Sequence, residues 1–195
     1  MHDFLSRQHW IFDMDGTLTF GDHDFVAIRK ELGLPEGVGI LEALDAMDDA
    51  TSAPLRERLF FIERELASAS RVAPDALALL NFLADKGATM GVLTRNALEL
   101  AHLTLSTVGL ASFFKKDEIL GRECASPKPS PDGVLRLIAG WGASPDDVVV
   151  VGDFLFDLQA GRAAGAGTVL IDREGHGHWG ETADVVVNSL DTLIS

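Results

Sequence analysis

The chain lacks the residues that several kinds of protein chemistry require. Cys124 is its single cysteine, and tyrosine is absent from its 195 residues. One cysteine excludes both an intramolecular disulfide and a metal site built from several thiolates. Because nothing in the flanking sequence activates a thiolate, we interpret Cys124 as a structural residue.

Long apolar runs are also missing, and basic charge is scarce. No uninterrupted apolar stretch is long enough to span a bilayer, and residues 1–8 resemble neither a secretory signal nor a transit peptide. We therefore expect a cytoplasmic protein without a membrane partner.

Sixteen basic residues stand against thirty acidic ones, for a formal net charge of −14. Because this charge repels polyanions, the sequence argues against a nucleic-acid partner.

What the chain does have is the composition of a folded globular protein, with 47% hydrophobic and 24% charged residues. Short apolar runs predict β-strands that alternate with helical patterns. Strands are expected at residues 10–12, 89–93, 148–151, 168–171 and 185–187, and helices at 74–86, 98–108, 131–139 and 155–164. This alternation predicts an α/β fold: a three-layer, Rossmann-like, doubly wound parallel sheet.

Residues 20–72 interrupt the alternation. Three helical patterns are expected at 26–32, 40–47 and 55–69, with glycines and prolines such as Pro54 between them. An aspartate within Asp22-His23-Asp24 is placed to cap the first of these helices. We predict an inserted helical segment over residues 20–72, carried by a core of residues 1–19 and 73–195.

Polar residues with a shared chemistry follow the predicted strands. They are Asp13 and Asp15 after the first strand, Thr94 after the second, Lys128 in a later turn, and Asp153 with Asp157 after the valine run. Ligands bind beyond the carboxyl ends of the strands in an open parallel sheet, so we expect these side chains to converge. Clustered carboxylates repel one another unless a hard cation lies among them, and Mg²⁺ prefers oxygen ligands. The lysine and the hydroxyl suit a phosphate group.

Four segments in the chain carry a resemblance to a known family. Residues 13–18, Asp-Met-Asp-Gly-Thr-Leu, resemble the first motif of the haloacid dehalogenase-like superfamily. Residues 93–96 resemble its second motif, Lys128 its third, and residues 152–157 its fourth. Because the four occur in the right order and each follows a predicted strand, they are more specific together than singly.

The resemblance implies an enzyme that works through a covalent intermediate. Asp13 would attack phosphorus and become an aspartyl phosphate, while Asp15 would protonate the leaving group and then activate water. Mg²⁺ would bind Asp13, the backbone carbonyl of Asp15, and Asp153. Asp157 would be a direct or an indirect ligand, or would only favour the helix dipole.

The resemblance also implies a set of phosphate-binding residues. Thr94 and Lys128 would hold the phosphoryl oxygens and share in catalysis, and Arg95 and Asn96 are further candidates for substrate binding. Each has a structural alternative, since Thr94 or Asn96 could cap the next helix and Arg95 could cover the rim of the sheet.

The resemblance implies that Asp15 favours phosphate-ester chemistry. Dehalogenases of the superfamily lack this aspartate, and its transport ATPases have threonine at the same position. The inserted segment resembles the helical cap of the phosphoglycolate phosphatase-like branch, but it is short, and Phe154 stands where a small polar residue is common. We expect a Mg²⁺-dependent phosphatase acting on a small phosphorylated metabolite.

A phosphomutase of the β-phosphoglucomutase type and a non-catalytic phospholigand-binding protein stay open as alternatives. The sequence leaves the oligomeric state open.

Two further sets of residues have a functional and a structural interpretation. Arg29, Arg56 and Arg64 in the inserted segment could meet substrate anions, but the solvated interpretation, with pairing to nearby acidic residues, leads. His176 and His178 lie among glycines and indicate a loop, at most with an adventitious metal contact.

Overall fold

The computed structural model describes residues 4–20 and 24–194. A six-stranded sheet runs through its centre in the order β3-β2-β1-β4-β5-β6, and every neighbouring pair is parallel. The strands are β1 (His9–Phe12), β2 (Thr89–Leu93), β3 (Ile119–Leu120), β4 (Val148–Gly152), β5 (Gly167–Ile171) and β6 (Val185–Val187). The predicted doubly wound α/β fold is confirmed. β3, a strand of two residues at the sheet edge, was missed because it is too short to show periodicity.

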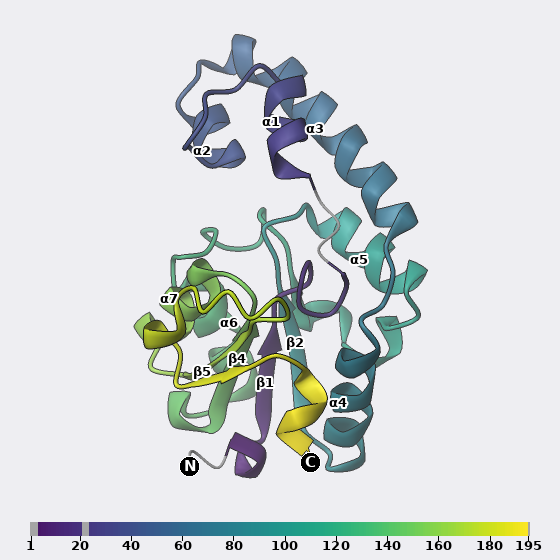
Figure 1. Cartoon of the computed structure of the whole chain (residues 1–195), viewed down its shortest axis with the longest axis vertical. Helices are drawn as coiled ribbons and strands as arrows, with labels where there is room; N and C mark the ends of the chain where they lie inside the picture. The colour runs from purple at the N-terminus through teal and green to yellow at the C-terminus, as the bar shows by residue number, and fades with distance from the viewer. Residues whose placement is uncertain (1–3, 21–23, 195) are drawn as a thin grey trace.

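Helices cover both faces of the sheet, which makes three layers (Figure 1). The core helices are α4 (Pro74–Asp85), α5 (Leu98–Thr107), α6 (Asp132–Trp141) and α7 (Leu155–Ala163). One apolar cluster joins α4, α5 and the C-terminal 3₁₀ helix η6 (Leu190–Ile194) to one face. A second cluster joins α6 and α7 to the other face.

The central strand β1 shows why these residues form a buried strand. Trp10, Ile11 and Phe12 are fully buried. Because successive side chains of a strand point to opposite faces, Trp10 and Phe12 belong to the cluster with α4 and α5, whereas Ile11 belongs to the cluster with α6 and α7. Phe12 pairs with Val92 on one side and Val151 on the other. The ends of β1, β2 and β4 therefore lie side by side.

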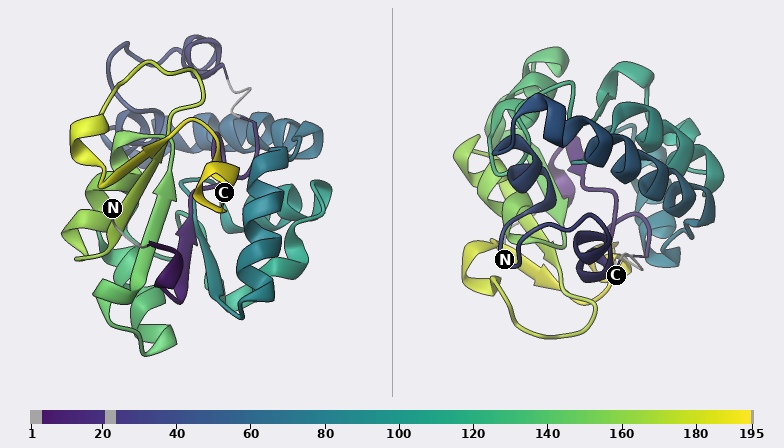
Figure 2. Two further views of the ribbon diagram at one scale, coloured as in Figure 1. Left: turned by 60° about the horizontal axis from the view of Figure 1, so that its bottom comes forward. Right: turned by 90° about the horizontal axis from the view of Figure 1, so that it is seen from above.

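Three further helices form a separate group beyond the carboxyl ends of the strands (Figures 1 and 2). They are α1 (Phe25–Glu31), α2 (Ile40–Asp45) and α3 (Asp49–Ala69), called here the helical segment. The segment has its own apolar cluster, which includes Ile28, Leu44 and Leu59.

The starts of the helices correct several predicted boundaries. Asp24 caps α1 as expected, accepting a hydrogen bond from the Ala27 N–H at 2.9 Å, whereas Asp22 and His23 lie outside the described residues. α3 begins six residues earlier than predicted, because Asp48 caps it and Pro54 lies inside it. α6 begins at Asp132, not at Pro131, and continues beyond residue 139 to Trp141.

Two chain connections join the helical segment to the rest of the chain, and they run side by side. Thr19 pairs with Val72 in an antiparallel bridge. The Phe20 N–H donates to the Arg71 carbonyl at 3.1 Å, and the Ala73 N–H donates to the Leu18 carbonyl at 3.0 Å. We call this pair of connections the neck. Within the described ranges, no helix is long and apolar enough to cross a membrane.

Candidate active site

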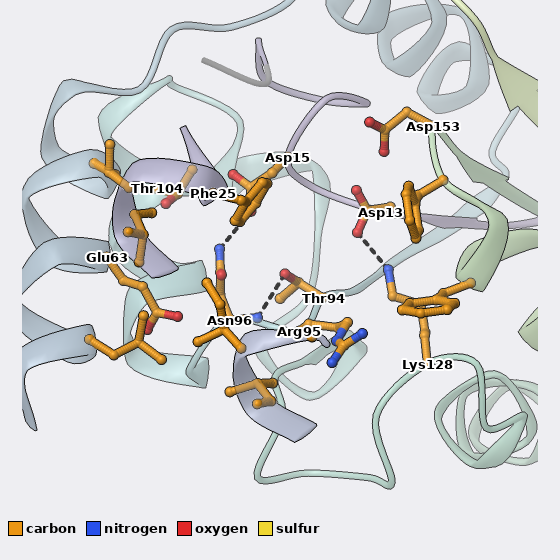
Figure 3. Close-up of a pocket in the computed structure, with 18 of the residues that line it drawn as sticks. Asp13, Asp15, Phe25, Glu63, Thr94, Arg95, Asn96, Thr104, Lys128 and Asp153 are labelled. Carbon is orange, nitrogen blue, oxygen red and sulfur yellow. Dashed lines mark hydrogen bonds and ion pairs between the residues drawn. The ribbon is translucent and has the colours of Figure 1, made fainter. Parts of the chain in front are cut away.

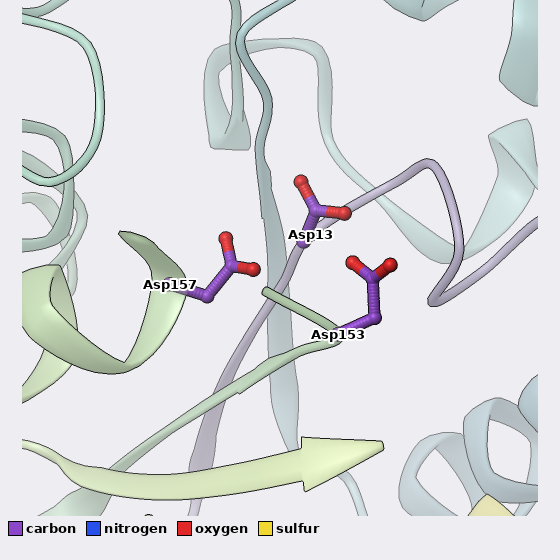
Figure 4. A group of neighbouring side chains, drawn as sticks. All are labelled: Asp13, Asp153 and Asp157. Atoms are coloured by element: carbon purple, nitrogen blue, oxygen red, sulfur yellow. The ribbon is translucent and has the colours of Figure 1, made fainter. Parts of the chain in front are cut away.

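Three carboxylates meet where β1 and β4 end (Figure 4). Asp13 follows β1, Asp153 follows β4, and Asp157 lies in the first turn of α7. One carboxylate oxygen from each residue lies within 4.8 Å of the other two. A set of oxygen donors at this spacing fits a hard divalent cation such as Mg²⁺.

The electrostatics of this cluster also fit a cation. Burial raises the pKa of Asp13 well above its ordinary value, the charge of Lys128 opposes this rise, and the neighbouring carboxylates add to it. Burial likewise raises the pKa of Asp153 to about 7, with the charge of Asp157 as the next cause. Both shifts mean that negative charge is costly at this position. A bound cation would remove that cost.

Lys128 supplies positive charge beside the cluster. Its Nζ lies 2.5 Å from Asp13 Oδ1 and 2.6 Å from Asp157 Oδ1, and it donates to the Leu93 carbonyl at 2.7 Å. The side chain is 4% exposed. Burial alone would lower the pKa of Lys128, but the two carboxylates raise it above its ordinary value. The ammonium therefore stays charged at neutral pH.

Asp157 has a structural role at the start of α7 and also belongs to the carboxylate cluster. Its Oδ2 accepts a hydrogen bond from the Phe154 N–H at 3.1 Å, which caps α7, while its Oδ1 pairs with Lys128. The structural role at the helix start therefore positions the carboxylate in the cluster.

Asp15, Thr94 and Asn96 form a second polar group beside Asp13 (Figure 3). Asn96 Nδ2 donates to Asp15 Oδ2 at 2.6 Å, and Thr94 Oγ1 accepts from the Asn96 N–H at 3.1 Å. The Thr94 hydroxyl thus stabilises the turn after β2, while the Asn96 amide orients the Asp15 carboxylate.

Arg173 holds the loop that carries Asp13 and Asp15, and sequence reasoning missed it. Its guanidinium donates to the carbonyls of Gly16 at 3.3 Å and Thr17 at 3.0 Å, and it pairs with Asp75 at 2.5 Å. Arg173 follows the strand predicted at residues 168–171, so the strand-end rule already contained the signal. Gly16 has a φ of 87°, and a Cβ at this position would collide with Asp153.

Among the described residues, two ion pairs connect the helical segment to the core. Arg95 Nη2 lies 2.5 Å from Glu42 Oε1 on α2. Arg122 Nη1 donates to both carboxylate oxygens of Glu63 on α3, at 2.8 and 3.0 Å. The Arg95 guanidinium also lies 5.1 Å from the centre of the Phe156 ring. Arg122 and Glu63 were not singled out from the sequence, because no local pattern marks a contact between distant segments.

A cavity of about 430 Å³ extends from the carboxylates to the helical segment (Figure 3). Asp13, Asp15, Thr94, Lys128 and Asp153 line its polar end. The other end is lined mainly by apolar side chains of the helical segment, among them Phe25, Ile28, Ile40, Leu41, Leu59 and Leu66. The predicted site residues are thus brought together at one end of a single cavity.

The remaining candidates have separate positions. Arg29 lines the cavity, and its Nε donates to the Val38 carbonyl at 3.1 Å. Arg56 pairs with Asp45 at 2.6 Å, which agrees with the solvated interpretation. The rings of His176 and His178 are tilted by 52° with centres 5.7 Å apart, and they lie outside the carboxylate cluster.

Comparison with known proteins gives the family. The family model for haloacid dehalogenase-like hydrolases matches residues 9–165. A haloacid dehalogenase-like hydrolase domain-containing protein of Arabidopsis thaliana is 31% identical, covering 85% of this chain and 71% of that protein. The phosphoglycolate phosphatase of Rhodospirillum rubrum is also 31% identical, over 83% of this chain and 78% of its own. The crystal structure of a hydrolase from Pseudomonas syringae has a TM-score of 0.79 at 26% identity, with 96% of both chains covered.

The chain belongs to the haloacid dehalogenase-like hydrolases, as its four motifs predicted. The family match and the phosphatase relatives together support the predicted enzyme class, a phosphoric monoester hydrolase.

Proposed function

We propose that the protein is a Mg²⁺-dependent phosphatase that hydrolyses a small phosphate monoester through an aspartyl phosphate on Asp13. The observation that supports this most directly is the position of the Asp13 carboxylate. It belongs to the carboxylate cluster suited to a cation, it also pairs with the ammonium of Lys128, and it lies at the polar end of a cavity. The similarity to a phosphoglycolate phosphatase supports a small phosphorylated substrate.

In the first chemical step, an Asp13 carboxylate oxygen forms a bond to phosphorus as the bond to the ester oxygen breaks. The departing alkoxide takes a proton from Asp15, whose carboxyl is oriented by Asn96. In the second step Asp15, now ionised, accepts a proton from water as that water attacks the aspartyl phosphate. Inorganic phosphate leaves, and Asp13 is regenerated.

Asp13, Asp153 and the Asp15 backbone carbonyl would hold Mg²⁺, with Asp157 as a direct or an indirect ligand. When bound, this cation neutralises charge on the phosphoryl oxygens and on the carboxylates. Lys128 already pairs with Asp13 and Asp157, so its ammonium is positioned to meet a phosphoryl oxygen beside them.

Thr94, Arg95 and Asn96 complete the proposed site. The Thr94 hydroxyl faces the cavity and is proposed to donate to a phosphoryl oxygen. Asn96 is proposed to act mainly through Asp15, and Arg95 to act near the substrate while it pairs with Glu42.

We propose that residues 20–72 form a cap over a core of residues 1–19 and 73–195. The ion pairs of Arg95 and Arg122 with this segment, and its apolar lining of the cavity, support that role. A cap in contact with the core would exclude bulk water from the reacting phosphate.

The test is phosphate release from a panel of phosphate monoesters, with Mg²⁺ or with EDTA. Wild type is compared with Asp13→Asn and with Asp117→Asn, because Asp117 is exposed and does not line the cavity. Release that requires Mg²⁺ and Asp13, and that survives Asp117→Asn, is the expected result. Full release in Asp13→Asn would refute the covalent mechanism, and interconversion of a sugar phosphate without free phosphate would favour the phosphomutase.

A further inference from the structure

Resting on the proposed function, we infer that the alcohol of the substrate ester is uncharged and carries a planar apolar group. Phe25, Phe154 and Phe156 are the residues assigned to contact that group. All three line the cavity that starts at Asp13. These phenylalanines determine specificity in this assignment, and none of them touches the reacting phosphorus.

The exposure of these rings is the first argument. Phe25 is 55% exposed and Phe154 is 43% exposed, and both rings line the cavity, whereas the similarly exposed Phe61 does not. Phe154 stands directly after the cluster residue Asp153, and its ring meets Phe156 edge-on with ring centres 5.0 Å apart. It also meets Trp179, with ring centres 4.6 Å apart. These contacts hold Phe154 at the cavity wall with exposed ring surface available for a ligand.

The second argument is charge. Arg95, whose guanidinium lies over the Phe156 ring, is already neutralised by Glu42. Arg122 is neutralised by Glu63, and the Glu63 carboxylate itself lines the cavity. Arg95 and Arg122 would therefore offer a negatively charged alcohol little net positive charge, and the Glu63 carboxylate would repel it. An uncharged one would meet mainly apolar side chains.

The third argument is size. A cavity of about 430 Å³ falls within the range of ligand pockets of roughly 300–1,000 Å³. A phosphate bonded to a two-carbon acid would leave the end lined by Ile28, Leu59 and Leu66 empty of substrate. A larger apolar alcohol would reach these side chains and displace water from them.

Arg29 is the competing feature. It lines the cavity, and within residues 4–20 and 24–194 it takes part in no ion pair. It could bind a carboxylate on a small acidic alcohol, so the experiment must separate the two substrate classes.

The experiment compares 2-phenylethyl phosphate, ethyl phosphate and phosphoglycolate as substrates of the whole protein with Mg²⁺. The leaving groups of the first two esters, 2-phenylethoxide and ethoxide, have similar basicity. The ratio of their kcat/KM values therefore reports binding of the ring and not leaving-group reactivity. We expect 2-phenylethyl phosphate to be favoured over ethyl phosphate about tenfold or more, the effect of burying part of a phenyl ring. Phosphoglycolate should be the poorest of the three.

Variants assign the effect to the cavity. Phe154→Ala should reduce the ratio toward one, whereas the control Phe61→Ala should leave it unchanged. Phe61 is 47% exposed on α3 and does not line the cavity. A ratio near one in wild type would overturn the inference. So would a preference for phosphoglycolate that is lost in Arg29→Met.

Failure of the proposed function has a different signature, since then none of the esters would be hydrolysed. In that case calorimetric binding of 2-phenylethyl phosphate and ethyl phosphate to the Mg²⁺-loaded protein reads the same preference without turnover. Tighter binding of the phenyl ester would still support the inference, and equal or undetectable binding of the two would overturn it.

Discussion

Replacing Lys128 by methionine removes a buried positive charge while keeping a side chain of similar length. The substitution leaves Asp13 and Asp157 without the ammonium that lies 2.5 and 2.6 Å from them, and it leaves the Leu93 carbonyl without its lysine donor. Because removing one partner of a buried pair exposes the other to an apolar environment, we expect a loss of roughly 3–5 kcal/mol in the free energy of unfolding without metal. For a chain of this size that corresponds to a fall in Tm of roughly 6–20 °C.

The pKa shifts of the carboxylates determine whether the stability loss in Lys128→Met grows or shrinks as the pH rises. The pKa of Asp153 is raised to about 7, so its carboxyl holds more protons in the folded state than in the unfolded state between pH 3.8 and about 7, and the raised pKa of Asp13 acts in the same direction. Stability therefore falls as the pH rises through that window. Because its pKa is raised, Lys128 stays charged in this range, and its attraction for the ionised carboxylates offsets part of this loss of stability. The difference between wild type and Lys128→Met should therefore widen from pH 5 to pH 8.

Urea unfolding followed by circular dichroism at pH 5, 6.5 and 8 in EDTA measures this difference. Lys115→Met is the control, because Lys115 is 71% exposed and pairs with Glu118 at 3.1 Å. The control should lose no more than about 0.5 kcal/mol. Excess Mg²⁺ should narrow the loss in Lys128→Met, since the cation replaces part of the missing charge. A loss below about 1 kcal/mol at pH 8, or one that shrinks as the pH rises, would refute the reasoning.

Three further predictions follow from charges in or near the site. Asp75→Asn should cost about 1–3 kcal/mol at pH 7 in urea unfolding, because it weakens the pair with Arg173. Burial alone would raise the pKa of Asp75, but the hydrogen bond and the charge of Arg173 outweigh burial and lower it. The stability that ionised Asp75 contributes is therefore present above pH 3.8 and should be lost as the pH falls further. Asp153→Asn should raise the Tm of the metal-free protein at pH 8, since the raised pKa of Asp153 marks a costly charge, and should abolish most of the rise in Tm caused by Mg²⁺. A lower metal-free Tm would contradict this. Arg122→Met should destabilise the protein by about 1–3 kcal/mol, because it leaves Glu63 at 15% exposure without its bidentate partner; an unchanged urea midpoint would show that this pair contributes nothing.

The sheet and the polar end of the cavity were predictable because their signals are local. Each of the five predicted strands is an apolar run, and parallel strands bring the residues after them to one edge, which placed Asp13, Thr94 and Asp153 together in advance. The same rule, applied to the strand at residues 168–171, would have reached Arg173.

The contacts of the helical segment were not predictable in this way. The Arg122–Glu63 and Arg95–Glu42 pairs join residues 59 and 53 positions apart, and they depend on how the helices pack over the sheet. The predicted start of α3 is wrong for a local reason, because Pro54 indicates a boundary although Asp48 caps a helix that includes it.

The neck allows the helical segment to vary in evolution independently of the sheet. Residues 18–20 and 71–73 are held together by hydrogen bonds of 3.0 and 3.1 Å and by the Thr19–Val72 bridge, so the segment between them leaves and rejoins the rest of the chain at nearly the same point. A stretch of gene encoding those helices could be lengthened, shortened or exchanged for another without altering the path of the strands. Under the proposed function, the alcohol that the enzyme accepts can therefore change during evolution while the phosphate chemistry is preserved.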